Sequence, residues 1–424
     1  MKRASPTDGP RTRARTRAAA AEAPDASSQA SDRTAAAVRA LLAEGAPGRA
    51  LQLLTSDGVC DSADPAVLAR LRELHPQADG PGLAAPLPED RPHVTPSWAT
   101  DQLLAMEAVV RSFPPGSAAG PSGLRPQHLL DCLNSADSAA KTGLLEALLT
   151  LVTTVSTGRL HPRAAPYLCA ARLIPLKKKD GGVRPIAVGD TLRRLTAKWL
   201  LATSQGRSAT AALAPLQTAF AKGGPCEVVA MGVQALAETL HGSTGWLLLQ
   251  VDLKNAFNSI HRPAILGSLE QRCPSMLPWV RQAFQPAPLL VGREVIWSTR
   301  GVQQGDPLGP FLFAAGIQAA LDALPPGGAL HRWYLDDGVF MGSVTEVEGV
   351  LTALQQTLPP LGLELNLRKT TVWDPGLVPA ASPLAAATRL HLEGGTEVLG
   401  VPIHAPLYPS PVGAHLSALK GKFA

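Results

Sequence analysis

The chain has few cysteines, and their spacing pairs none of them. Five cysteines are scattered along 424 residues, and no two form a Cys-x-x-Cys pair. An odd, dispersed set of this kind indicates neither a disulfide framework nor a zinc site. The chain also lacks an apolar signal core near its start and any run approaching the ~20 apolar residues that span a bilayer. We therefore expect an intracellular protein, nuclear or cytoplasmic, that is neither secreted nor bound to a membrane.

Aromatic residues and net charge are also low. Phe, Trp and Tyr make up 4% of the chain, and 39 Lys and Arg face 34 Asp and Glu, which leaves a net charge of +5. This balance is too even to indicate a nucleic-acid partner, so the local distribution of charge is more informative. Between Ala171 and Leu200 there are eight Lys or Arg against two Asp. Such a local excess is typical of a surface that faces phosphates.

The composition divides the chain into three parts. Residues 1–34 are rich in Ala, Ser, Pro and Arg with almost no large apolar residue, which predicts a disordered basic arm. The alternating arginines from Arg11 to Arg17 fit a nuclear address or a nucleic-acid arm as well as a solvated tail. Residues 35–97 show helical spacing as far as His75 and then a Pro/Gly-rich linker. The remaining part, 98–424, carries the motifs described below.

Apolar periodicity predicts the elements of this last part. The expected helices are Asp101–Phe113, Ala136–Thr157, Thr191–Ala202, Cys226–Thr239 and Leu308–Leu321. Two short apolar runs on either side of Gly292 predict a β-hairpin that turns at this glycine.

Two acidic sites far apart in the chain follow apolar runs. Trp246–Val251 is typical of a short buried strand, and Asp252 stands where it ends. Asp336, Asp337 and Gly338 separate two apolar, aromatic-rich runs, and Asp-Gly in that setting predicts a hairpin turn. Side by side, the strands would bring three carboxylates to one sheet edge. Carboxylates so close to one another repel unless cations share them, and Mg²⁺ prefers such oxygen ligands. Taken alone, however, an Asp after a strand is more often a helix cap, and an Asp-Gly pair is more often a simple turn.

Seven segments occur in the order and spacing of the motifs of reverse transcriptases, and the chain resembles the non-LTR (LINE-like) retrotransposon branch of that family. In chain order they are Gly116–Leu124, Ile174–Ile186, Val251–Ile260, Gly301–Pro310, Tyr334–Asp337, Gly362–Thr370 and Val398–Pro402. They resemble the block that opens the fingers, the fingers motif for the incoming nucleotide, four palm motifs and the primer-grip hairpin. No single motif is conclusive, but their combined order over about Ser112 to Ile403 is highly specific.

The resemblance implies an α+β fold with a right-hand polymerase fingers-palm core, an antiparallel palm sheet and a small N-terminal helical region. It also implies nucleotidyl transfer by two metal ions, which clamp the attacking and leaving oxygens. In the matched register, the metal ligands are Asp252, Asp336 and Asp337. Mg²⁺ is the expected ion and Mn²⁺ the alternative. Lys369 is then the candidate general acid for the leaving pyrophosphate, and its simpler interpretation is an exposed lysine at a strand end.

The same register implies residues that contact the incoming nucleotide. The main chain from Leu253 to Ala256 is expected beside the triphosphate. Lys178 and Arg184 are expected over its phosphates, Arg184 through its planar guanidinium.

Three further residues complete this nucleotide-binding set. Phe257 stands where the family keeps a bulky residue beneath the sugar of the nucleotide. A ring at this position would clash with a 2′-hydroxyl and so select deoxynucleotides. Packing of the first turn after a strand is the simpler role for this ring. Gln304 and Gly305 are expected to contact the nucleotide and the template. Gly309 is a departure from the family, because many relatives carry a serine at this position.

The motifs together predict an RNA-directed DNA polymerase of a retrotransposon, with an RNA template, a DNA or RNA primer and dNTPs as partners. Only about twenty residues follow Ile403, too few for a helical thumb. No endonuclease, ribonuclease H or Cys/His knuckle is evident. We therefore expect an absent or truncated thumb in the 98–424 domain. A companion endonuclease or thumb is expected on another chain or outside this fragment.

Three alternatives remain open. The first is a catalytically inactive or domesticated domain that binds RNA. The second is a polymerase that makes RNA, against which Phe257 speaks. The third is a purely structural helical protein, which requires every motif to be a coincidence.

Overall fold

The computed structural model describes residues 26–43, 50, 53, 58–78, 97–178, 180–214, 216–221, 224–240, 245–373, 388–390 and 395–404. The chain forms two compact units, Met1–Leu54 and Thr55–Ala424. The sequence-based boundary before residue 98 does not coincide with this division. Among the described helices, none is both long enough and apolar enough to cross a membrane.

The first unit contains helix α1 (Ala26–Ala43). This segment is rich in alanine and free of proline and glycine, which favours a helix. The expectation of disorder over residues 1–34 is therefore wrong for residues 26–34. Residues 1–25 lie outside the described part of the chain.

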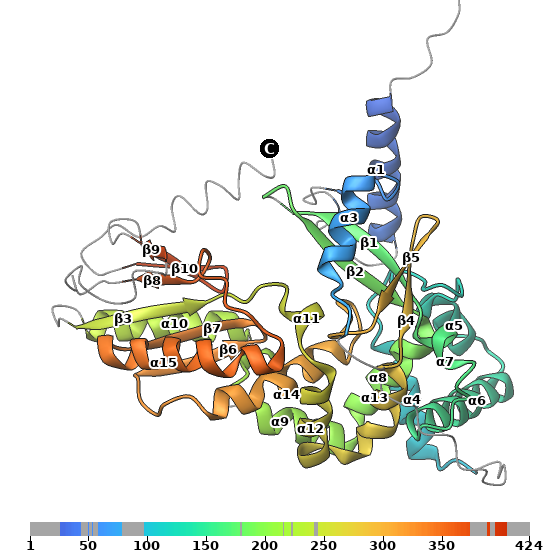
Figure 1. Ribbon diagram of the computed structural model, residues 1–424. Helices are drawn as coiled ribbons and strands as arrows, with labels where there is room; N and C mark the ends of the chain where they lie inside the picture. Colours follow the sequence, from blue (N-terminus) through green and yellow to red (C-terminus); the bar gives the residue numbers. More distant parts are fainter. Residues whose placement is uncertain are drawn as a thin grey trace, which may run out of the picture. The chain divides into compact units, whose positions relative to one another are not determined.

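A four-stranded sheet forms one half of the second unit (Figure 1). Its strands are β1 (Ala171–Lys177), β2 (Val183–Gly189), β4 (Ala287–Val291) and β5 (Glu294–Ser298), in the order β2-β1-β4-β5. β1 is antiparallel to β2 and parallel to β4. The hairpin expected at Gly292 is confirmed as β4–β5.

Residues 58–78, which the sequence assigned to a separate helical region and the linker after it, pack on this four-stranded sheet. Helix α3 (Pro65–Leu74) buries Leu71 and Leu74 in one cluster with Leu173, Leu289 and Ile296 of the sheet. The segment before it extends the edge of β1, because the Lys177 N–H donates to the Gly58 carbonyl at 3.0 Å. These residues are therefore part of the second unit.

A five-stranded sheet forms the other half of the unit. Its strands are β3 (Trp246–Val251), β6 (Leu330–Tyr334), β7 (Asp337–Ser343), β8 (Thr371–Trp373) and β9 (Thr388–Leu390), in the order β6-β7-β3-β8-β9. The pairings β6–β7, β7–β3 and β3–β8 are antiparallel, and only β8–β9 is parallel. The expected mixed helix-and-sheet fold with antiparallel strands is thus found, and the parallel β9 is an addition to it.

Strand β3 is buried on both faces, as its continuous apolar sequence predicts. Leu247, Leu249 and Val251 belong to the main core, whereas Trp246 and Leu248 belong to a second cluster with residues of α10 and the β10–β11 hairpin. This alternation follows from the two-residue period of a strand.

Besides α3, the second unit contains helices that the sequence predicted and helices that it did not. Their bounds are α4 (Thr100–Arg111), α5 (Pro126–Leu133), α6 (Ser138–Ser156), α7 (Ala165–Cys169), α8 (Thr191–Ala202), α9 (Ser204–Leu213), α10 (Pro225–Thr239), α11 (Ala256–Ser259), α12 (Arg262–Arg272), α13 (Leu277–Ala283), α14 (Gly309–Asp322) and α15 (Val344–Thr357). The five helices predicted from periodicity correspond to α4, α6, α8, α10 and α14. A short hairpin, β10 (Thr396–Val398) and β11 (Val401–Ile403), completes the described fold.

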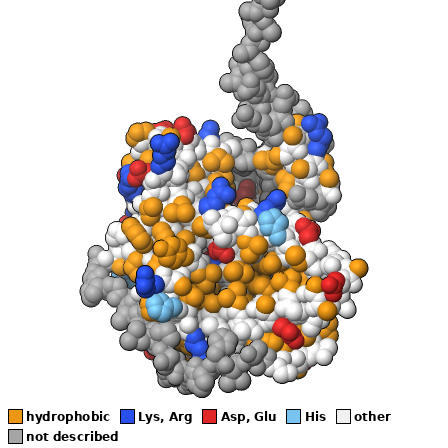
Figure 2. All heavy atoms as spheres, turned by 90° about the vertical axis from the view of Figure 1, so that its right-hand side faces the viewer, with side chains coloured by type: hydrophobic (Ala, Val, Ile, Leu, Met, Phe, Trp, Pro, Cys, Tyr) orange, Lys and Arg blue, Asp and Glu red, His pale blue; other side chains and the backbone are white. Residues whose placement is uncertain are grey.

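Few charged side chains lie on the face shown in Figure 2, and hydrophobic ones are spread over its middle. The charges visible there have both signs. The described side chains on this face therefore show no basic excess of the kind that binds a phosphate backbone.

A buried ion pair joins α8 to the loop before α14. Arg193 Nη2 and Nε lie 2.7 Å and 3.0 Å from Asp306 Oδ2, and their side chains are only 5% and 9% exposed. Arg193 Nη1 also donates to the Cys169 carbonyl. Removing one partner of such a pair leaves the other charge buried without compensation.

We predict that Asp306→Asn lowers the free energy of unfolding by about 3–5 kcal/mol, because it leaves the buried Arg193 without its counter-charge. Asp322→Asn is the matched control, since Asp322 and its partner Arg272 are 53% and 32% exposed and an exposed pair contributes less than about 1 kcal/mol. Urea unfolding followed by circular dichroism measures both variants. Equal losses in the two would contradict this account.

Candidate active site

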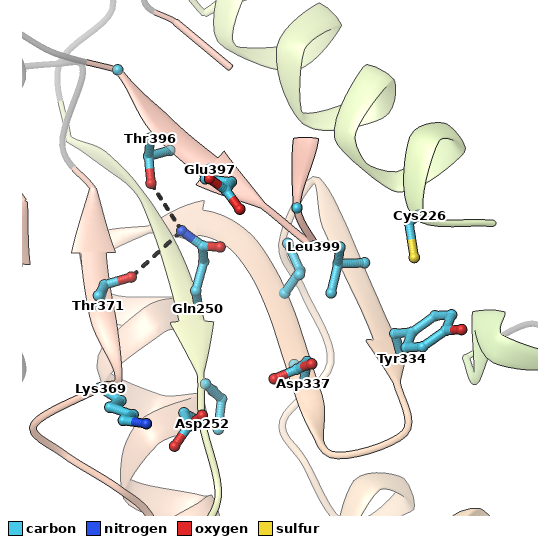
Figure 3. Close-up of a pocket in the computed structure, with 15 residues that line it drawn as sticks. Cys226, Gln250, Asp252, Tyr334, Asp337, Lys369, Thr371, Thr396, Glu397 and Leu399 are labelled. Carbon is cyan, nitrogen blue, oxygen red and sulfur yellow. Dashed lines mark hydrogen bonds between the residues drawn. The ribbon is translucent and has the colours of Figure 1, made fainter. Parts of the chain in front are cut away.

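The pairing of β3 with β7 brings two of the acidic residues together. Val251 pairs with Gly338 at the end of the antiparallel ladder, so the next two positions are Asp252 and Asp337. Opposite residues in an antiparallel pair project to the same face. Both residues line one cavity of about 630 Å³, together with Lys369 and Tyr334, and Figure 3 shows them around it.

The third carboxylate, Asp336, lies in the β6–β7 turn. Tyr334 pairs with Asp337, which leaves Leu335 and Asp336 as the two loop residues, and Leu335 takes a left-handed φ of 59°. The predicted hairpin is therefore confirmed, but its turn comes before the Asp337-Gly338 pair that was expected to form it. Gly338 belongs to β7, where a Cβ atom would lie 2.8 Å from the ring of Trp333. The glycine thus serves close packing instead of a turn.

The three carboxylates repel one another. Burial raises the pKa of Asp337 to about 7, and the charges of Asp336 and Asp252 add to this rise. Burial also raises the pKa of Asp336; the charge of Asp252 raises it further, and Arg184 opposes it. The Asp337 residue is nevertheless exposed to solvent, so water screens part of the repulsion and moderates the rise. Bound cations would relieve such repulsion.

The fourth motif holds Asp252 in place. Asn366 Nδ2 donates to Asp252 Oδ2 at 2.8 Å, and the Asn366 N–H donates to the Asp252 carbonyl at 2.8 Å. The buried Thr370 accepts a hydrogen bond from the Asp252 N–H at 3.3 Å through its hydroxyl. The sequence pointed to Lys369 in this motif and missed Asn366 and Thr370, although all three fall in the matched segment.

Lys369 lines the cavity with Asp252 and contacts the tip of the β1–β2 hairpin. Its Nζ lies 3.7 Å from Asp180 Oδ2, and both side chains are more than half exposed. The hairpin tip is a tight turn, in which the Lys178 N–H donates to the Gly182 carbonyl at 2.8 Å. Lys178 is half-buried, while Arg184, on β2, is exposed. The structure therefore brings Arg184 close enough to Asp336 to lower the pKa of that carboxyl. It also places Lys369 beside the β1–β2 hairpin that carries Arg184.

The segment after Asp252 is fixed from two sides. Leu253 forms an antiparallel bridge with Leu365, and the Lys254 N–H donates to the Glu364 carbonyl at 2.9 Å. Ala256 is buried in the main core. Asn255 takes a left-handed φ of 47°, and its Nδ2 donates to the carbonyl of Leu74 in α3 at 2.9 Å.

Phe257 has a packing role in the structure. Its ring stacks on Phe313 of α14 with centroids 4.8 Å apart and planes 8° apart. The side chain remains half-buried, so one part of the ring meets the core and the rest reaches its surface. The simpler interpretation of this residue is thus present, and it leaves the proposed contact with a sugar open.

Gln304 and Gly305 contact β2 through their backbones. The Gln304 carbonyl accepts a hydrogen bond from the Ala187 N–H at 2.7 Å. Gly305 has a φ of 119°, and a Cβ there would lie 2.5 Å from the Ala187 carbonyl oxygen. Only glycine fits this approach.

The β10–β11 hairpin, which contains the segment that resembles a primer grip, closes one side of the cavity. Its Thr396 hydroxyl accepts a hydrogen bond from Gln250 Nε2 at 3.1 Å, and Thr371 on β8 accepts one at 3.4 Å, as Figure 3 shows. Gln250 therefore links β3, β8 and the hairpin at the cavity wall.

The carboxylates are not assembled as a ready ion cage. In the part of the chain that the structure describes, no three His, Cys, Asp or Glu side chains form a group that could hold a metal ion as they stand. Asp336 is absent from the lining of the cavity that Asp252 and Asp337 share. The donor set, all carboxylate oxygens, nevertheless has the chemistry that Mg²⁺ and Mn²⁺ prefer.

Comparisons with known proteins agree with the motifs. Residues 176–403 match the family model described as reverse transcriptase (RNA-dependent DNA polymerase). The retrotransposable element SLACS 132 kDa protein of Trypanosoma brucei gambiense is 30% identical over 223 residues, which are 49% of this chain and 18% of that protein. The R2 retrotransposable element Pol polyprotein of Bradysia coprophila is 24% identical over 304 residues, 66% of this chain and 32% of that protein.

Solved structures give a weaker likeness. A telomerase from Candida albicans has a TM-score of 0.37 and 12% identity, covering 48% of this chain and 41% of that one. A telomerase from Candida tropicalis also has a TM-score of 0.37 and 12% identity, covering 49% and 50%.

The family match covers more than half of the chain, while the chain spans less than a third of the length of the two retrotransposon relatives. Together with the order of the motifs, this match shows that the chain belongs to the reverse transcriptase (RNA-dependent DNA polymerase) family, in its non-LTR retrotransposon branch.

Proposed function

We propose that this protein adds deoxynucleotides to the 3′ end of a DNA or RNA primer, copying an RNA template by a two-metal mechanism. The observation that carries the proposal is the placement of Asp252 and Asp337 across the end of the β3–β7 ladder, with Asp336 in the adjoining turn. Burial raises the pKa of Asp337 to about 7, and the charges of Asp336 and Asp252 add to this rise. Divalent cations would remove the repulsive part.

The metal-binding proposal assigns a role to each carboxylate. Asp252, Asp336 and Asp337 would hold two divalent ions, which would supply the positive charge that activates the primer hydroxyl and neutralises the triphosphate. Asp252 would share both ions, Asp336 would be the second essential ligand, and Asp337 would complete the set. Asn366 orients the Asp252 carboxylate through its hydrogen bond to Oδ2. Asp336 would have to turn toward the cavity to join the other two.

The nucleotide would lie between the two sheets. Arg184 and Lys178 on the β1–β2 hairpin would contact its phosphates, and the main chain from Leu253 to Ala256 would lie beside them. Lys369 would donate a proton to the pyrophosphate, which requires it to leave Asp180, 3.7 Å away.

The wall of the nucleotide site would be completed by the loop before α14. Gln304 and Gly305, which meet β2 through Ala187, would contact the base and the template strand. Their fixed backbones would keep this wall rigid during nucleotide entry.

A second candidate function is RNA binding without catalysis. It is favoured by one observation, the lack of a preassembled three-ligand group among the described residues. All three carboxylates are nevertheless present, so we place this function second.

Primer extension tests the proposal. We expect the full chain to incorporate dTTP on a poly-rA template with an oligo-dT primer in Mg²⁺. Asp336→Asn should lower this rate by about a hundredfold or more, because it removes charge from the proposed ion site. Asp131→Asn, at an exposed position of α5, is the control and should keep the wild-type rate.

The outcomes separate the two candidates. Undiminished incorporation by Asp336→Asn would refute the metal assignment. RNA binding that persists in EDTA, with no incorporation in Mg²⁺ or Mn²⁺, would support the non-catalytic function instead.

The sugar preference gives a further prediction. Phe257→Ala should raise rNTP incorporation relative to dNTP by about tenfold or more, because the ring would no longer clash with a 2′-hydroxyl. Phe313→Leu removes the ring on which Phe257 stacks and serves as the control for lost packing. It should lower stability without changing the preference. An unchanged ratio in Phe257→Ala would leave this ring with a packing role alone.

A further inference from the structure

Gln217 is a fully buried polar residue that contacts the turn carrying the acidic pair. It lies between α9 and the short 3-10 turn Thr218–Phe220, and its exposed fraction is 0%. Its side chain meets the main chain of Leu335, 118 residues later, at both polar atoms. The Leu335 N–H donates to Gln217 Oε1 at 3.0 Å, and Gln217 Nε2 donates to the Leu335 carbonyl at 3.4 Å.

The neighbours of Gln217 hold the end of β6 in the same way. The Trp333 N–H donates to the Leu216 carbonyl at 2.8 Å, and the Thr218 hydroxyl donates to the Trp333 carbonyl at 2.8 Å. Gln217 itself forms a parallel bridge with Trp333. The segment from Leu216 to Thr218 therefore runs beside the strand, and only the Gln217 side chain reaches the turn.

The turn needs such support because Leu335 has a left-handed backbone. Its φ of 59° is unfavourable for a residue with a Cβ. The Leu335 side chain packs against the main core, and its N–H and carbonyl both bond the buried amide of Gln217. A buried N–H or carbonyl without a partner is costly. A primary amide holds a carbonyl acceptor and N–H donors in a single plane, so it can bond both groups at once.

We propose that Gln217 is a positioning residue for the reaction: it holds the Leu335–Asp336 turn, which carries Asp336 next to the Asp337 that faces Asp252. Gln217 touches the backbone of the turn and neither carboxylate. This inference rests on the proposed polymerase function, and it assigns a task to a residue outside the metal and nucleotide sets described above.

Gln217→Met tests this task, because methionine keeps the length and apolar stem of the side chain but loses both hydrogen bonds. Gln282→Met is the matched control. Gln282 is 1% exposed, and its Nε2 donates to the carbonyls of Gly158 and Leu160 at 2.8 Å and 2.7 Å. Both variants thus remove a buried glutamine that bonds to main chain, but only one of them borders the acidic turn.

The first readout is primer extension by the full chain at a series of Mg²⁺ concentrations, with the folded fraction measured by circular dichroism. We expect Gln217→Met to lower kcat by about tenfold or more, since small misplacements of reacting groups have effects of up to about a hundredfold. The Mg²⁺ concentration for half-maximal rate should rise, and KM for primer–template should stay within about twofold of wild type. Gln282→Met should keep the wild-type Mg²⁺ dependence per folded molecule.

The second readout is Mn²⁺ binding to each protein by electron paramagnetic resonance, which needs no turnover. Weaker Mn²⁺ binding in Gln217→Met than in Gln282→Met supports the positioning role, even where the wild type incorporates no dNTP and the proposed function itself fails. Equal Mg²⁺ dependence and equal Mn²⁺ binding in the two variants overturn it. A wild type that neither binds Mn²⁺ nor incorporates dNTP overturns both proposals.

Discussion

The antiparallel pairing of β3 with β7 is the constraint on which the acidic site depends. Val251 opposite Gly338 fixes the register, and this register alone sets Asp252 across from Asp337. A shift by one residue would send one of the two carboxylates to the other face of the sheet. The register is well determined because β3 is buried on both faces. The Trp333 ring, which packs where Gly338 has no side chain, bears on the neighbouring β6–β7 pairing.

The energetic consequence of this pairing is a cluster of like charges that the fold has to hold together. Burial and mutual repulsion raise the pKa of Asp336 and of Asp337, so the site opposes its own ionisation. Hydrogen bonds from outside the carboxylates restrain it: Asn366 bonds Asp252, and Gln217 bonds the main chain of Leu335. Because the carboxylates repel one another without cations and the hydrogen bonds keep them from moving apart, the site favours the binding of cations.

The sequence was informative where a signal is local. The strand Trp246–Val251 has the bounds predicted from its apolar run, and α8 has those predicted from its spacing. The hairpin near Asp337 was also predicted, but its turn was placed too late, because a leucine with left-handed φ carries no turn signature. Gln217 and Asn366 could not be assigned by pattern, since their partners lie 118 and 114 residues away. The first half of α1, residues 26–34, was missed because composition was weighed above helix propensity.

The proposed function depends on Asp252, Asp336 and Asp337 sharing a pair of divalent ions. Anomalous X-ray diffraction from crystals of this protein soaked in Mn²⁺, with primer–template and a non-hydrolysable dNTP, tests it most directly. The claim predicts two anomalous peaks about 3.5–4 Å apart, both within coordination distance of Asp252 and at least one within reach of Asp336. Crystals that hold nucleotide but show no peak beside Asp252 would contradict it.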